Sequence, residues 1–182
     1  MKYFIKWFIK SSLVSALCIK KCQAKCCKGI PPPISDSEIE QLAMHLGYKD
    51  FYEEHSCQKG QYYLIKKQKK NKIECYFLNS QNYCSIYSLR PLDCQLFPFF
   101  ANIEVLDTKH WKITWYYQEC SLSYHILKNK KLPAIREIFL KRLKGSVEDI
   151  WQYHIGLQAT NAIEGKIKIY SENLNPQGKK TN

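Results

Sequence analysis

Residues 84–99 read CSIYSLRPLDCQLFPF, and this stretch decides what kind of fold the chain of 182 residues can form. Two cysteines, Cys84 and Cys94, flank the step from Arg90 to Pro91. A proline fixes its own φ angle and disfavours helix in the residue before it, so we expect a loop here. The whole chain holds nine cysteines, more than packing alone requires. The stretch therefore predicts a fold in which sulfur chemistry holds loops together.

The composition around this stretch is that of one folded, basic domain. Lys and Arg number 28 and Asp and Glu 16, a formal net charge of +12, while 45% of residues are hydrophobic and 14% aromatic. That much apolar material excludes a disordered basic tail, and the length suits a single core. We expect four segments: an amphipathic N-terminal helix over residues 1–17, a cysteine-cluster metal-binding domain over 18–125, its C-terminal helical extension over 126–172, and a disordered tail over 173–182.

The N-terminal residues 1–17 do not have the pattern of a secretory signal. Lys2, Lys6 and Lys10 interrupt the apolar residues, so no continuous hydrophobic core is left. The lysines form one stripe of a helix, which either packs on its own domain or lies on a membrane surface. No segment reaches the roughly 18 apolar residues of a spanning helix. The sequence thus predicts a cytoplasmic protein with no transmembrane span.

Local patterns predict the regular elements. Helical patterns occur at four places: residues 36–46, 50–55, 134–144 and 147–153. Strand patterns form two pairs: 62–65 with 73–78 around a lysine-rich turn, and 103–106 with 111–117. Ser35 and Glu38 have the spacing of a capping box at the start of the first helix. Pro133 opens the third.

The cysteines form groups along the chain with one outlier. The grouped residues are Cys18, Cys22, Cys26 and Cys27, then Cys75, Cys84 and Cys94, with Cys120 further on. Cys57 stands apart. On one helix Cys18, Cys22 and Cys26 would share a face, because residues four apart are neighbours. Zinc and iron–sulfur clusters are held by sets of four thiolates, so eight cysteines suit two centres; buried free thiols or disulfides are the alternatives, since no CxxC pair occurs.

The stretch quoted first resembles the hallmark of the YkgJ-type cysteine-cluster family, CxxCxxCC, in which a cysteine, Ile-Tyr, Arg-Pro, a cysteine and Phe-Pro recur in this order. Residues 75–78, CYFL, resemble the family's upstream CxFL, and residues 18–27 resemble its N-terminal cluster. Cys120 corresponds to its last cysteine. The resemblance covers residues 18–120 and implies a zinc- or iron-chelating domain. Some members of the family are described as iron–sulfur oxidoreductases or occur with flagellin lysine methylation.

One departure from the family concerns the first cluster. It reads CxxxCxxxCC here, one residue longer in each gap. Either a helical spacing keeps all four ligands, or one cysteine is displaced and the first site is altered. Cys18 and Cys22 are the residues that this question concerns.

Other residues near the cysteines have both structural and chemical interpretations. Arg90 would either neutralise a thiolate-rich centre or hold its loop by bonding backbone carbonyls. A dry surround for the loop is expected from Tyr87, Phe97, Phe99 and Phe100. His55 lies two residues from Cys57. The two residues would form an accessory metal site; the alternative is that His55, like the other histidines, does not bind metal.

Signatures of common enzymes are absent from the sequence. No GxGxxG, GxxxxGK[ST], HExxH or GxSxG pattern occurs, so no catalytic residue is assigned. The lysines of residues 59–72 and 128–131 would attract phosphate backbones or simply face solvent. Nucleic acid is therefore a secondary candidate partner.

These observations predict an α+β fold, in which small antiparallel strand pairs and cysteine-rich loops are stapled by metal and flanked by N- and C-terminal helices. The predicted function is chelation of zinc or iron by eight thiolates. A first alternative is an iron–sulfur redox or accessory protein with a modification enzyme as its protein partner. A second is a basic, zinc-stabilised module that binds nucleic acid, or a membrane surface through residues 1–17.

Overall fold

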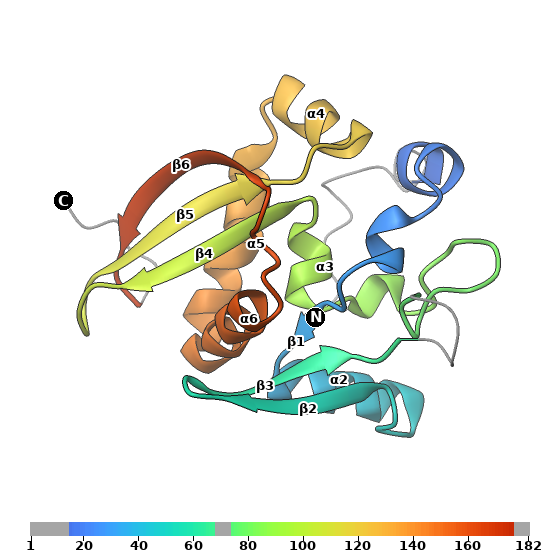
Figure 1. Ribbon diagram of the computed structural model, residues 1–182, viewed down its shortest axis with the longest axis horizontal. Helices are drawn as coiled ribbons and strands as arrows, with labels where there is room; N and C mark the ends of the chain where they lie inside the picture. Colours follow the sequence, from blue (N-terminus) through green and yellow to red (C-terminus); the bar gives the residue numbers. More distant parts are fainter. Residues whose placement is uncertain (1–14, 68–73, 177–182) are drawn as a thin grey trace.

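The computed structural model describes residues 15–67 and 74–176, and in these residues two small β-sheets are covered by helices (Figure 1). In chain order the elements are η1 (Ser15–Lys21), η2 (Lys25–Lys28), β1 (Pro33–Ile34), α2 (Asp36–Leu46), β2 (Tyr52–Cys57), β3 (Gly60–Ile65), η3 (Tyr87–Leu89), α3 (Leu92–Leu96), β4 (Phe99–Val105), β5 (Trp111–Tyr117), α4 (Ser121–Lys128), α5 (Leu132–Gly145), α6 (Val147–Ala159) and β6 (Ile167–Leu174). η1 is a π-helical turn, whereas η2 and η3 are short 3-10 helices. The predicted α+β class is confirmed.

The helices begin and end at residues that favour these positions. The capping box of Ser35 and Glu38 is present at the start of α2, and Gly47 ends that helix with a φ of 79°. This left-handed conformation favours glycine, which has no Cβ to clash. Pro133 lies in the first turn of α5, where its missing N–H removes no helical hydrogen bond. The helices predicted over 36–46, 134–144 and 147–153 are confirmed. α4 is an additional helix, and so is α3, which lies within the stretch predicted as a loop.

The first sheet has the antiparallel order β1–β3–β2. The helix predicted over 50–55 is wrong, because β2 pairs with β3 through a turn that ends at Gly60, whose φ is 130°. The predicted pairing of 62–65 with 73–78 is also wrong. Of the described residues after β3, Cys75 and Leu78 form only isolated bridges, with Lys67 and Cys84. Strand pairing across a tight glycine turn overrides the local helical pattern here.

The second sheet has the antiparallel order β4–β5–β6. The predicted pair of 103–106 with 111–117 is confirmed by β4 and β5. β6 then pairs with β5, with Tyr170 opposite Trp115. The C-terminal extension predicted to be helical through 172 therefore ends in a strand, and disorder from 173 is wrong for the first two residues, because β6 continues to the fully buried Leu174.

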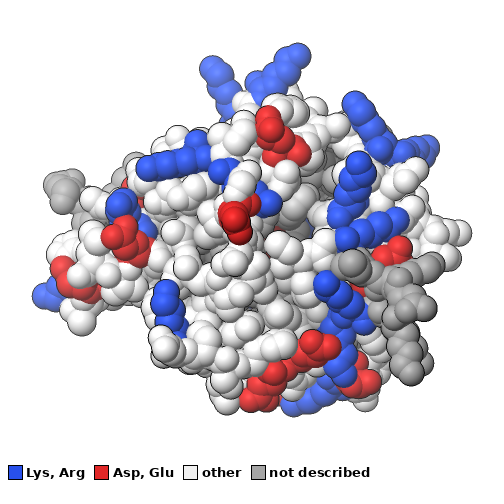
Figure 2. Space-filling model, viewed as in Figure 1, with Lys and Arg blue, Asp and Glu red and all other residues white. Residues whose placement is uncertain are grey.

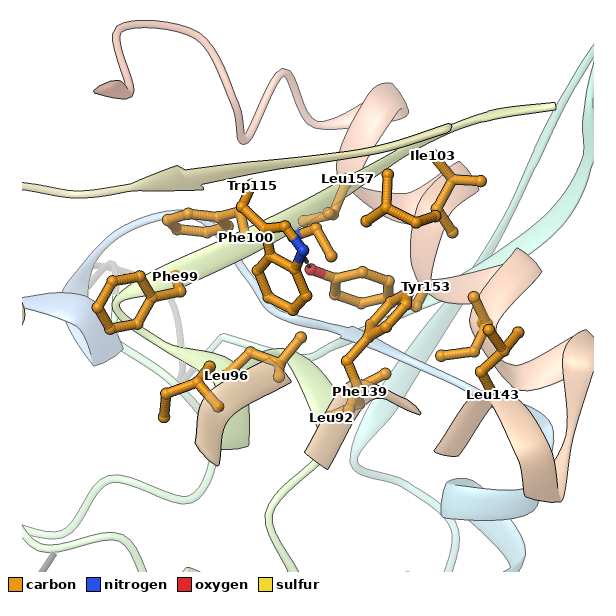
Figure 3. Close-up of a cluster of buried hydrophobic side chains, with 14 of the residues drawn as sticks. Leu92, Leu96, Phe99, Phe100, Ile103, Trp115, Phe139, Leu143, Tyr153 and Leu157 are labelled. Carbon is orange, nitrogen blue, oxygen red and sulfur yellow. Dashed lines mark hydrogen bonds between the residues drawn. The ribbon is translucent and has the colours of Figure 1, made fainter. Parts of the chain in front are cut away.

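The described residues form two hydrophobic cores, and α6, which contributes to the larger one, packs against β1 and β3 as well as β4 and α5. The larger core lies between the second sheet and α3, α5 and α6 (Figure 3). In it the rings of Trp115 and Phe139 meet edge to face with centroids 5.5 Å apart, and the Tyr153 hydroxyl accepts the Ala101 N–H at 3.1 Å. The smaller core joins α2 and the first sheet to the cysteine loop through Phe77 and Ile86.

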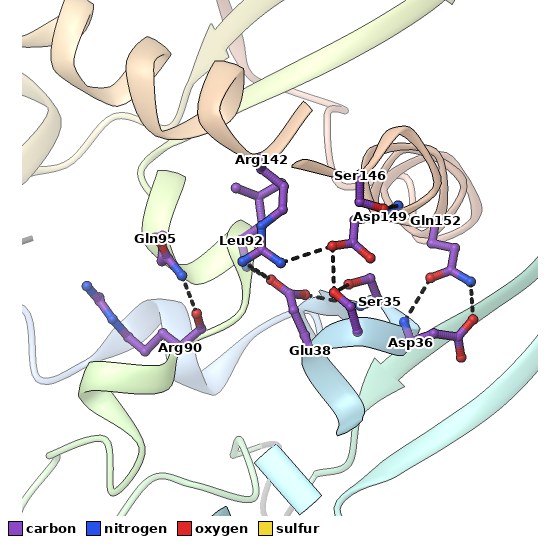
Figure 4. Close-up of polar contacts among 11 residues, drawn as sticks. Ser35, Asp36, Glu38, Arg90, Leu92, Gln95, Arg142, Ser146, Asp149 and Gln152 are labelled. Carbon is purple, nitrogen blue, oxygen red and sulfur yellow. Dashed lines mark hydrogen bonds and ion pairs between the residues drawn. The ribbon is translucent and has the colours of Figure 1, made fainter. Parts of the chain in front are cut away.

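A buried polar network fixes the start of α3 relative to α2, α5 and α6 (Figure 4). Glu38 Oε1 accepts the Leu92 N–H at 2.7 Å and lies 3.0 Å from Arg142 Nη2. Arg142 Nη1 also contacts Asp149 Oδ2 at 3.1 Å, and Ser37 donates to the same oxygen at 2.6 Å. The network therefore holds in place the short helix that carries Cys94.

Some predictions fall on residues that the structure does not describe. These are residues 1–14 of the expected N-terminal helix, residues 68–73 of the lysine-rich turn and residues 177–182 of the expected tail. In the described part of the chain, no helix has the length and apolar character needed to cross a membrane.

Candidate metal centre

One cavity of about 860 Å³ lies between residues 17–33, the cysteine loop and helices α4 and α5. Its walls include all the cysteines predicted as ligands: Cys18, Cys22, Cys26, Cys27, Cys75, Cys84, Cys94 and Cys120. Cys57 is exposed at the end of β2 and is not part of the walls. All nine cysteines are free thiols. The fold thus brings together residues that are spread over about a hundred positions of sequence.

Three of these cysteines, Cys75, Cys84 and Cys94, form what we call the loop group. Cys75 and Cys84 are held by the isolated bridges that follow β3, and both pack against the smaller core. Cys94 lies in α3. The three side chains are close enough that negative charge on Cys75 or Cys84 raises the pKa of Cys94. Three separate segments therefore present sulfur to one region of the cavity.

Cys18, Cys22 and Cys120 line the same cavity and form what we call the helix group. Cys18 lies in η1, which packs against α4, and Cys120 is the N-cap residue of α4. Cys18 and Cys120 contact the larger core. The Sγ of Cys120 accepts the Ser123 N–H at 3.4 Å, and charge on Cys120 or Cys22 raises the pKa of Cys18. This group joins the N-terminal segment to the second sheet.

The two lengthened gaps of the first cluster have unusual backbone conformations. In the first gap, the Cys22 N–H bonds to the Leu17 carbonyl five residues back, at 3.0 Å, so the π-helical turn takes up roughly one residue more than an α-helical turn. In the second gap, Gln23 and Ala24 both have a φ of 53°, which is uncommon outside glycine. The three cysteines therefore do not share one helical face, because the helix breaks at these residues. Cys18 and Cys22 nevertheless both lie on the cavity wall.

The adjacent cysteines Cys26 and Cys27 lie between the two groups. Their sulfurs are 3.9 Å apart, and the Cys27 carbonyl accepts the Cys75 N–H at 2.7 Å. Charge on Cys26 raises the pKa of Cys18 in the helix group and of Cys75 and Cys84 in the loop group. The pair therefore lies within reach of both groups.

Burial makes the thiols poor acids. It raises the pKa of Cys18 to about 12 and that of Cys75 to about 11, and it raises the pKa of Cys94 well above its usual value. A hydrogen bond with Cys27, followed by burial, raises the pKa of Cys26. Without a cation these groups are neutral at physiological pH, whereas coordination to a metal ion deprotonates a thiol outright.

The donor set suits zinc or iron. Soft thiolates favour these metals, whereas magnesium and calcium prefer oxygen. Within residues 15–67 and 74–176, no three Cys, His, Asp or Glu side chains already converge on one point. Each thiol can turn about its χ1 bond, so ligand geometry forms together with metal binding, as in other metal-dependent folds.

Other side chains complete the cavity wall. Arg90 and three of the four expected aromatic residues, Tyr87, Phe97 and Phe100, line the cavity, whereas Phe99 is fully buried in the larger core. Asp93 also lines the cavity, although the sequence analysis did not identify it. Its Oδ1 is buried without a hydrogen-bond partner among the described residues, and burial, with a smaller effect of Glu38, raises its pKa to about 7. The sequence feature that could have identified Asp93 is its position next to Cys94.

The remaining candidates lie outside this cavity or on its rim. His55 stacks on Tyr62 with ring centroids 5.2 Å apart, and among the described residues it joins no ligand set with Cys57. Lysine and arginine side chains surround a largely uncharged centre on the face shown in Figure 2. Lys66 pairs with Asp50, so part of the expected basic patch is neutralised.

Fold and cavity together define a small cysteine-cluster domain of the metal-binding class. The model of the family CxxCxxCC, described as "Putative zinc- or iron-chelating domain", matches residues 17–121, more than half of the chain. The protein belongs to this family, and all eight cavity cysteines lie in the matched region. No solved structure matches the chain.

Proposed function

We propose that this protein chelates zinc or iron with all eight cavity cysteines, arranged as two four-thiolate centres. The observation that carries the proposal is the division of the cysteines: eight line one cavity and the ninth, Cys57, lies outside it. Thiolates bind zinc tetrahedrally in sets of four, and iron–sulfur clusters use the same number.

The loop group supplies three thiolates to one centre and the helix group supplies three to the other. Cys26 and Cys27 supply the fourth thiolate of each, because this adjacent pair lies between the groups. In zinc-loaded protein, every coordination position is closed by sulfur, which is typical of structural sites. Metal binding then contributes directly to folding of the N-terminal segment and the cysteine loop.

Metal analysis with thiol counting on anaerobically purified protein tests this proposal. We expect close to two zinc ions per chain, with eight of the nine thiols protected from alkylation. Cys57→Ser is the matched control and should leave the metal content unchanged, whereas Cys84→Ser should lower it. A metal-free protein with disulfides would contradict the proposal.

The same sample distinguishes zinc from an iron–sulfur cluster. Zinc-loaded protein is colourless, whereas a cluster gives a brown sample whose sulfur-to-iron absorption bleaches on reduction. A reducible cluster would make the protein a redox or accessory partner of another enzyme rather than a structural module.

A further inference from the structure

The three arginines of this chain differ in their partners. Arg136 forms ion pairs with Glu172, and Arg142 with Glu38 and Asp149. Arg90 has no carboxylate partner among the described residues, and its side chain extends away from the Arg142 network (Figure 4). Arg90 is half-buried as a residue, and its hydrogen bond to Tyr87 is exposed, so this charge without a carboxylate partner in the described part of the chain is not sealed from solvent.

The loop around Arg90 fixes its position. The Nε donates to the Tyr87 carbonyl at 3.1 Å, and the guanidinium carbon lies 3.9 Å from the centroid of the Tyr87 ring. The Arg90 carbonyl accepts from Gln95 Nε2 at 2.6 Å. Of the three guanidinium nitrogens, Nε makes the hydrogen bond to Tyr87. Among the described residues, neither Nη atom has a hydrogen-bond partner. Four N–H donors of a permanently charged group therefore stay available at the cavity wall.

Arg90 lines the same cavity as both groups of cysteines. A divalent ion held by four thiolates carries two net negative charges, which a nearby fixed positive charge stabilises. Four lysines also line the cavity: Lys25, Lys66, Lys67 and Lys166. Of these, Lys66 pairs with Asp50, and Lys166 lies 5.7 Å from the centroid of the Phe100 ring.

We propose that Arg90 is the charge-compensating residue of both thiolate centres, and that its guanidinium favours the metal-loaded form. The inference rests on the function proposed above, and it gives Arg90 a role beyond holding its loop. Residues that contact metal ligands typically change metal affinity by about 10- to 100-fold when they are replaced.

Zinc affinity of three variants tests the proposal, measured by competition with a chromophoric chelator at about 0.01 M and 1 M salt. Arg90→Gln should weaken zinc binding about 10-fold or more at low salt, and the loss should shrink at high salt, because salt screens charge. Arg90→Lys, which keeps the charge but not the fork, should retain affinity within about 3-fold. Lys109→Gln removes one exposed charge from the turn between β4 and β5 and should have no effect.

Two outcomes would overturn the inference. If Arg90→Gln binds zinc as tightly as the unchanged protein, Arg90 does not compensate the centres. If Arg90→Gln and Arg90→Lys lose the same affinity at both salt concentrations, Arg90 acts only by holding its loop. Failure of the unchanged protein to bind zinc or iron would instead refute the proposed function, so the two failures are distinguishable.

Discussion

Replacement of Glu38 by alanine should destabilise the protein more than any exposed substitution on α2. The Glu38 side chain is only 6% exposed and accepts the N–H groups of Ser35 and Leu92 besides pairing with Arg142. Each buried donor left without a partner costs about 1–3 kcal/mol, and breaking a buried ion pair costs about 3–5 kcal/mol. Arg142 retains Asp149 at 3.1 Å, so we expect a total near the lower limit of the sum, about 5 kcal/mol.

Urea unfolding at a fixed excess of zinc measures this loss. Glu40→Ala is the matched control, because Glu40 lies on the same helix and pairs with Lys49 at an exposed site. Exposed ion pairs contribute little to stability, so this variant should unfold at nearly the same urea concentration as the unchanged protein. Equal losses for the two variants would refute the reasoning that the buried network fixes α3.

Two further predictions concern α6. Burial, with a smaller effect of the Lys59 charge, lowers the pKa of His154 from 6.5 to about 4, so between these values the unfolded chain binds a proton that the folded chain does not. The contribution of His154 to stability should be complete above pH 6.5 and fall by about 3 kcal/mol toward pH 4. In pH-dependent unfolding, the stability of His154→Gln should therefore fall less over this range than that of the unchanged protein; an unchanged slope would contradict the assignment. A Cβ at Gly156 would lie 2.5 Å from Pro33 Cβ, so Gly156→Ala should cost about 1–3 kcal/mol in thermal unfolding, although alanine favours helix. A Cβ at Gly145 meets nothing within 4 Å, so Gly145→Ala should be neutral or stabilising. Equal changes in thermal stability for the two variants would argue against close packing of α6 on β1.

Local signals in the sequence were sufficient for much of the fold. The capping box of Ser35 and Glu38 places the start of α2 correctly, and Pro133 does the same for α5. Signals of this kind are encoded within a few residues. β6 could not be found in this way, because it is paired with a strand more than fifty residues earlier, and β2 was mistaken for a helix because its partner lies across the turn at Gly60.

In the candidate site, too, some features could be predicted from local sequence and others could not. Resemblance and spacing identified the eight cysteines that line the cavity, and Cys57 was recognised as the outlier. Cys75 and Cys84 pack against the smaller core and Cys18 and Cys120 against the larger one, and this information is not local. Asp93 was missed because a single acidic residue in a five-residue helix carries no pattern of its own.

The backbone between Cys18 and Cys26 has a consequence for how relatives of this protein are found. A π-helical turn and two left-handed residues change the path of the chain while Cys18, Cys22 and Cys26 all remain on the cavity wall. The number of residues between cysteines is therefore a poor guide to whether they line the same site. A search that requires the literal pattern CxxCxxCC would pass over chains like this one, whereas a search that allows one extra residue in either gap and requires the downstream Arg-Pro and Phe-Pro would retain them.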